Sequence, residues 1–86
     1  MFEIRWDKKA KEELKKFEIF VARRIVKKIK GLANDPHSGN VKRLVGSDYY
    51  RLRVGDYRVI FDIKEKLRVL LVLKIGHRKN VYKKGF

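Results

Sequence analysis

The 86 residues, 44% of them hydrophobic, suffice for one domain with a modest core, and the absence of cysteine excludes disulfides and thiolate chemistry. The 24 Lys and Arg residues outnumber the 10 Asp and Glu residues in both halves: residues 1–45 carry 13 basic and 6 acidic groups, and residues 46–86 carry 11 and 4. No apolar run approaches the roughly 20 residues of a membrane span and residues 1–5 lack a signal-peptide layout, so we expect a cytoplasmic protein.

The N-terminal half predicts a strand followed by two helices. Apolar and charged residues alternate over residues 2–6, which is typical of a short strand. Asp7 can cap a helix that begins at Lys8, and apolar positions of this helix fall on one face: Ala10, Leu14 and Phe17. A second helical pattern spans residues 19–33 and ends before Pro36. The short break between the helices predicts an antiparallel pair.

After residue 40 the hydrophobic period becomes that of strands. Residues 50–54 and 57–63 alternate around Gly55-Asp56, a plausible two-residue hairpin turn. Residues 67–75 are almost entirely apolar, as in a central strand covered on both faces, and a short extra strand is plausible near residues 41–44. The expected fold is α+β: an antiparallel-rich sheet of about four strands with an N-terminal helical hairpin packed on one face.

The predicted hairpin gathers three arginines. A two-residue turn at Gly55-Asp56 places Arg53 opposite Arg58 and puts Arg51 on the same face, away from the apolar face expected under the helices. Like charges across a strand pair are destabilising unless something anionic binds there, and the guanidinium fork suits phosphate. The alternative is an exposed strand face whose side chains extend into water.

A polar segment with proton-transfer and stacking groups follows the last strand. His77 can give or take a proton near neutral pH, Tyr82 can stack on a nucleobase, and Arg78 adds a cation. The alternative is that His77 caps the strand and the Tyr82 ring folds onto the core. His37, beside Pro36, is interpreted as a loop residue at the surface.

The charge favours a polyanionic partner over a merely solvated basic surface, because the acids are too few for ion-pair networks. No carboxylate and histidine cluster has metal-ligand spacing, and we expect no cofactor. DNA hydrolysis generally depends on metal ions, whereas RNA carries its own nucleophile, the 2′-hydroxyl. A basic site without metal is therefore suited to RNA.

The chain resembles the RelE/ParE superfamily of type II toxin–antitoxin toxins, and its RelE branch in particular. The resemblance spans nearly all of residues 1–86 as a single RelE-like domain. It is carried by YRLR at residues 50–53, GDYR at 55–58, GHR at 76–78 and Tyr82, with support from residues 35–36 and 42–44. It implies a metal-independent, ribosome-dependent mRNA endonuclease (an mRNA interferase, a hydrolase) that inhibits translation and is silenced by an acidic antitoxin.

The resemblance also implies residue roles. Arg58 matches a phosphate-binding arginine, Arg78 a second catalytic arginine, and Tyr82 the tyrosine that stacks on the substrate base. Arg51 and Arg53 stand where a well-known branch has lysines, and arginine cannot act as a base because it holds its proton. His77, also at a lysine position, is thus the candidate for proton transfer. The candidate catalytic set is Arg53, Arg58, His77, Arg78 and Tyr82, with Arg51 and Lys79 as substrate-binding residues.

Two other functions stay open. A ParE-type toxin would inhibit a topoisomerase through protein contact, with the same fold and an acidic antitoxin. A noncatalytic RNA- or ribosome-binding module would use charge alone, so substitution of His77 and Tyr82 would barely affect it.

Overall fold

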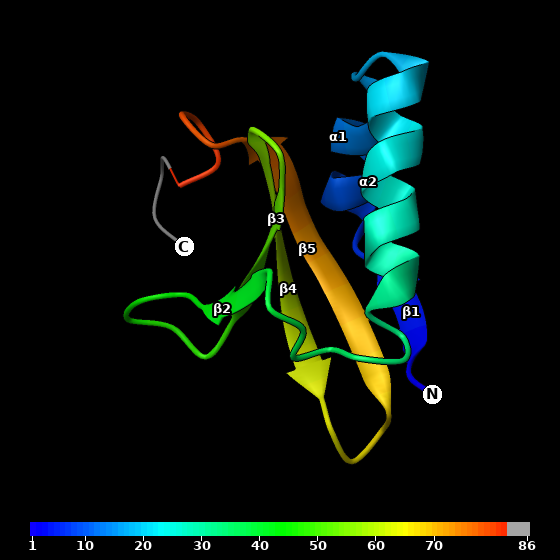
Figure 1. The fold of residues 1–86 in the computed structure, drawn as a ribbon, viewed down its shortest axis with the longest axis vertical. Coiled ribbons are helices and arrows are strands. Elements are labelled where there is room, and N and C mark those ends of the chain that lie inside the picture. Colours follow the sequence, from blue (N-terminus) through cyan, green and yellow to red (C-terminus); the bar gives the residue numbers. More distant parts are fainter. Residues whose placement is uncertain (83–86) are drawn as a thin grey trace.

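Two helices lie against one face of a five-stranded sheet in the computed structural model, which describes residues 1–82 (Figure 1). The elements in chain order are β1 (Glu3–Trp6), α1 (Lys8–Lys15), α2 (Ile19–Gly31), β2 (Val41–Arg43), β3 (Tyr50–Val54), β4 (Tyr57–Lys64) and β5 (Val69–His77). The sheet order is β1-β5-β4-β3-β2, in which β1 and β5 are parallel and the other neighbours antiparallel. The predicted α+β class is confirmed, with five strands instead of about four because residues 41–43 pair with β3.

Local signals account for the helix boundaries. Asp7 caps α1 as predicted, since its Oδ2 accepts a hydrogen bond from the Lys9 backbone N–H at 3.2 Å. α2 ends at Gly31, before the predicted residue 33, because the N–H groups of residues 32–34 bond three residues back in a tightened last turn. α2 leads the chain back along the sheet in the direction opposite to α1 (Figure 1). Among residues 1–82, neither helix is both long and apolar enough to cross a membrane.

The β3–β4 hairpin has the predicted register. Val54 pairs with Tyr57, Arg53 with Arg58, and Arg51 with Ile60. Gly55 adopts a φ of 57°, a left-handed conformation that costs glycine little and makes the tight turn possible.

β5 is displaced along the sequence from the predicted strand, residues 67–75. Leu67 is exposed and Arg68 has a φ of 55°, so the strand begins after them, and it continues through Gly76 to His77, which pairs with Tyr57. The β4–β5 register changes from Ile60 opposite Lys74 to Phe61 opposite Val72, which leaves Leu73 as an extra residue. This bulge resets the alternation of faces along β5.

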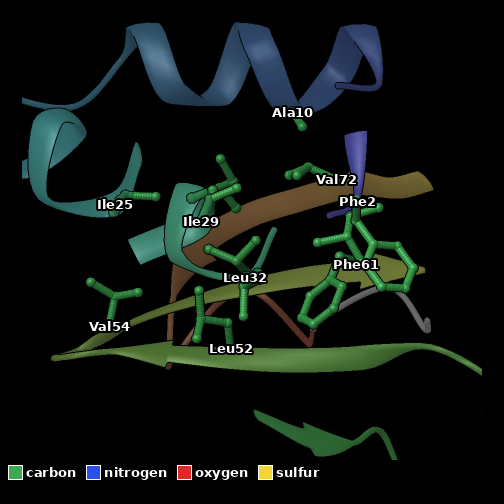
Figure 2. Close-up of a cluster of buried hydrophobic side chains, with 12 residues drawn as sticks. Phe2, Ala10, Ile25, Ile29, Leu32, Leu52, Val54, Phe61 and Val72 are labelled. Atoms are coloured by element: carbon green, nitrogen blue, oxygen red, sulfur yellow. The ribbon is translucent and has the colours of Figure 1, made fainter. Parts of the chain in front are cut away.

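The core fills the space between the helices and the sheet, where Ile25, Ile29 and Leu32 of the α2 region meet Leu52, Val54 and Phe61 of the hairpin (Figure 2). The apolar hairpin face is therefore covered by helices as predicted, and Tyr57 packs against its edge. On the opposite face, Ile60 and Val81 are buried outside this cluster. Residues 78–82, which follow β5, lie on that opposite side of the sheet (Figure 1).

Candidate functional site

Basic side chains gather on the sheet face that the helices leave open. Directly paired residues project from the same face, so the pairing of Lys42 with Arg51 and of Arg53 with Arg58 puts four cations on one surface. This face is opposite to the one that carries Leu52 and Val54 into the core. The prediction that Arg51, Arg53 and Arg58 share a face is confirmed.

This face is hollowed. A cavity of about 500 Å³, here called the basic hollow, is open to solvent and is lined by Lys42, Arg43, Leu44, Val45, Arg51, Arg58, Arg78 and Tyr82. A smaller side hollow of about 210 Å³ is lined by Gly39, Asn40, Lys42, Arg51, Arg53 and Arg58. Lys42, Arg51 and Arg58 line both, so the two hollows form one continuous basic surface.

The Arg58 guanidinium is fixed by the backbone of its own hairpin. Its Nη1 donates to the carbonyl oxygens of Gly55 and Tyr57, both at 2.8 Å. These two bonds fix the orientation of the guanidinium group. Both use Nη1, so Nη2 and Nε take part in neither of them. A cation held in this way is preorganised for an anion and loses little freedom when it binds one.

Arg78 reaches the basic hollow from the C-terminal side and is tied to the same hairpin turn. Its backbone N–H donates to the Asp56 carbonyl at 2.7 Å, and its Nε lies 3.7 Å from Asp56 Oδ1. Both side chains are more than half exposed, so the ion pair adds little stability. The main effect of the ion pair is to orient the Arg78 side chain.

A compact turn carries Tyr82 back over the sheet. The His77 carbonyl accepts the N–H groups of Asn80 at 2.8 Å and Val81 at 2.9 Å. Val81 is 1% exposed and lies over Gly76, where an added Cβ would come within 3.3 Å of the Val81 Cβ. Tyr82, which follows, stays 39% exposed at the basic hollow.

His77 points away from this surface. Its ring lies edge-on to Tyr57, with the centroids 5.8 Å apart, and Tyr57 in turn meets Phe17 beside α1 at 5.2 Å. The His77 Nδ1 accepts the backbone N–H of Lys79 at 3.1 Å, so in the neutral ring the proton is on Nε2. Leu70 and Val72 face the helices before the bulge at Leu73, and because of the bulge Ile75 and His77 face the same side after it.

The structure thus brings together most of the predicted site. Arg51, Arg58, Arg78 and Tyr82 line the basic hollow and Arg53 lines the side hollow. His77 lines neither, and neither does the exposed Lys79. The expectation that the imidazole meets the arginines in one pocket is wrong, because the register of β5 after the bulge at Leu73 turns the His77 side chain to the helix-covered face.

One wall of the basic hollow was missed by the sequence analysis. It comes from β2 and the loop after it, residues 42–45, where Arg43 Nη2 pairs with Asp48 Oδ1 at 3.0 Å and Val45 is 96% exposed. The signal was the short strand expected near residues 41–44, since pairing it with residues 50–54 places Lys42 beside Arg51. In the part of the chain that the structure describes, no three His, Asp or Glu side chains are grouped to hold a metal ion.

A family match covers nearly the whole chain, and a match to a curated protein covers about half of it. Residues 4–82 match the family model described as the ParE toxin of the type II toxin–antitoxin system parDE. A curated RelE1 toxin homologue of Methanocaldococcus jannaschii is 40% identical over 45 residues, a match that spans 51% of this chain and 50% of that protein.

Solved structures of toxin–antitoxin complexes share the fold. The RelE–RelB complex of Pyrococcus horikoshii OT3 contains a chain with a TM-score of 0.79 and 28% identity, covering 93% of this chain and 98% of that one. The intact RelBE complex of E. coli contains a chain with a TM-score of 0.76 and 25% identity, covering 90% of this chain and 96% of that one.

Proposed function

Because this chain belongs to the ParE toxin family of type II toxin–antitoxin systems and resembles RelE toxins in structure, we propose that it is a metal-independent endoribonuclease that cleaves mRNA on the ribosome and so inhibits translation. The observation that carries the proposal is the basic hollow, in which Arg51, Arg58 and Arg78 meet Tyr82. Guanidinium groups match the oxygens of a phosphodiester, and an exposed phenol ring can stack on a base.

The chemistry is in-line attack of a 2′-hydroxyl on the adjacent 3′-phosphate. Arg58, held through Nη1, stabilises the charge that develops on the phosphorane, with Arg51, Arg53 and Arg78 around it. Tyr82 holds the base and so fixes the angle of attack. The products carry a 2′,3′-cyclic phosphate and a 5′-hydroxyl.

In this proposal His77 acts by positioning. Its carbonyl and Nδ1 accept three N–H groups of the turn that carries Arg78 and Tyr82 to the basic hollow. Its ring packs beside Tyr57 on the helix-covered face and lines neither hollow, so in this proposal it exchanges no proton with a bound phosphate.

The ribosome supplies the geometry of the substrate. The basic hollow is wide and open to solvent, so the protein alone constrains a flexible RNA weakly. The test is to incubate the purified protein with free mRNA and with mRNA in programmed ribosomes, in the presence of a chelator, and to map the RNA ends. We expect 5′-hydroxyl ends and faster cleavage on the ribosome. Cleavage that leaves 5′-phosphate ends or needs a divalent metal would overturn the proposal.

The partner that silences the protein is an acidic antitoxin. The related chains of P. horikoshii and E. coli were solved in complexes with RelB. Here Ile19 and Phe20 are 68% and 65% exposed on α2, next to a groove of about 400 Å³ lined by Ile19, Ala22, Arg23, Val26, Lys27 and Lys30. Apolar side chains flanked by three cations suit an acidic amphipathic helix, whose binding should weaken with added salt.

Topoisomerase inhibition is the second candidate, because the family model that the chain matches is described as ParE. Such a toxin needs no preorganised phosphate site. Inhibition of supercoiling by the purified protein, with mRNA left intact, would select this function. RNA binding without either activity would indicate the noncatalytic module.

A further inference from the structure

We propose that Lys42 is the proton donor to the leaving 5′-oxygen in RNA cleavage, an assignment that rests on the endoribonuclease function proposed above. The basic hollow contains few groups that can donate a proton. Of its charged or titratable lining residues, four are arginines, and only Lys42 and Tyr82 can release a proton in ordinary conditions.

The sheet places Lys42 among the phosphate-binding candidates. It is paired with Arg51 across β2 and β3, and the two share a face with Arg53 and Arg58. Together with Arg51 and Arg58 it lines both hollows, whereas Tyr82 lines only the basic hollow. A phosphate seated on Arg51 and Arg58 is therefore within the reach of the flexible lysine side chain.

The Lys42 amine is also not committed to an ion pair within residues 1–82. Arg43 next to it pairs with Asp48, Lys64 pairs with Asp62, and Arg78 pairs with Asp56. Arg51, Arg53 and Arg58 line the side hollow with Lys42, so a phosphodiester held by these guanidinium groups would have its leaving oxygen beside a primary amine that can donate a proton.

Cleavage transfers one proton from Lys42 to the leaving oxygen. The 2′-oxygen forms a bond to phosphorus and its proton passes to water. The bond between phosphorus and the 5′-oxygen breaks, and its electron pair remains on that oxygen, which takes a proton from Lys42 Nζ. The amine then regains a proton from water, and the ends are a 2′,3′-cyclic phosphate and a 5′-hydroxyl.

A leaving-group substitution tests the role directly. Ribosomes are programmed with mRNA that carries either the ordinary 5′-oxygen or a bridging 5′-sulfur at the cleavage site, because a thiolate leaves without a proton donor. On ordinary mRNA we expect Lys42→Ala and Lys42→Arg each to slow cleavage by about 10²–10⁴-fold, the usual contribution of general acid catalysis. On the 5′-sulfur substrate the defect should largely disappear.

Lys42→Arg keeps the charge and removes the proton donor. Lys66→Ala is the matched control, since Lys66 is exposed in the turn beyond the far end of β4 and lines neither hollow. Thermal unfolding of each variant is the control for folding, and because Lys42 is exposed we expect an unchanged midpoint.

The outcomes separate the two proposals. A wild-type rate for Lys42→Arg, or an equal defect on both substrates, would show that Lys42 contributes only charge and would overturn the assignment while leaving the endoribonuclease function intact. If the wild-type protein cleaves neither substrate, the endoribonuclease function fails and the assignment fails with it.

Discussion

Asp56 holds Arg78 at two points: its carbonyl oxygen accepts the Arg78 backbone N–H at 2.7 Å, and its Oδ1 lies 3.7 Å from Arg78 Nε. The neighbouring Gly55 carbonyl accepts Nη1 of Arg58. One hairpin turn therefore positions two arginines that reach the basic hollow from β4 and from the C-terminal segment. Each contact predicts a separable effect on activity.

Removal of the Asp56 carboxylate should affect activity more than stability. In Asp56→Ala the backbone hydrogen bond to Arg78 remains, but the Arg78 guanidinium loses its ion-pair partner. We expect the cleavage rate to fall by about fivefold, the equivalent of roughly 1 kcal/mol. The midpoint of thermal unfolding should hardly change, because both side chains are more than half exposed. Glu3→Ala, which breaks the equally exposed pair with Arg5, is the control and should leave cleavage unchanged. A large loss of stability in Asp56→Ala would contradict this explanation.

Arg58 should contribute most to transition-state stabilisation. Arg58→Ala is expected to lower the cleavage rate on programmed ribosomes by about 10²–10³-fold, as loss of one preorganised donor does. Arg58→Lys should not restore it, because a lysine cannot bond both carbonyls and still present a planar fork. Arg23→Ala removes the same charge from α2 and serves as the comparison. An Arg58→Ala variant with the wild-type rate would show that the basic hollow is not the cleavage site.

Two substitutions of His77 distinguish a positioning role from a role in proton transfer. An asparagine at this position can present its Oδ1 to the Lys79 N–H in place of Nδ1, whereas alanine cannot. We expect His77→Asn to retain cleavage within about threefold of wild type and to keep the shape of its pH–rate profile. His77→Ala should lose about fivefold or more, since one hydrogen bond of the turn is worth roughly 1 kcal/mol. Equal inactivation of both variants would show that the His77 imidazole itself transfers a proton.

Gly76 should be intolerant of a side chain. A Cβ there would lie 3.3 Å from the Cβ and 3.5 Å from the Cα of buried Val81, so the turn after β5 would have to move. We expect Gly76→Ala to lower the free energy of unfolding by about 1–3 kcal/mol, the usual cost of overpacking. At Gly31 an added Cβ meets nothing within 4 Å, so Gly31→Ala is the matched control and should be neutral or slightly stabilising. Urea denaturation of both variants measures the difference, and equal stability would refute the contact.

The sequence alone determined the features that depend on near neighbours in the chain. Asp7 as the cap of α1, the turn at Gly55 and the register that sets Arg53 opposite Arg58 were all predicted correctly. A cap or a two-residue turn is decided within a few residues, and every deeper pair of a hairpin follows from its turn.

Only the tertiary structure decided which of the candidate groups meet. The bulge at Leu73 turns His77 toward Tyr57, and the pairing of three-residue β2 with β3 brings in Lys42, which the sequence analysis had not selected. The contact of Asp56 with Arg78 joins residues 22 positions apart. Pairing between distant segments depends on how the whole sheet closes, and one extra residue in a strand reverses the face of every side chain after it.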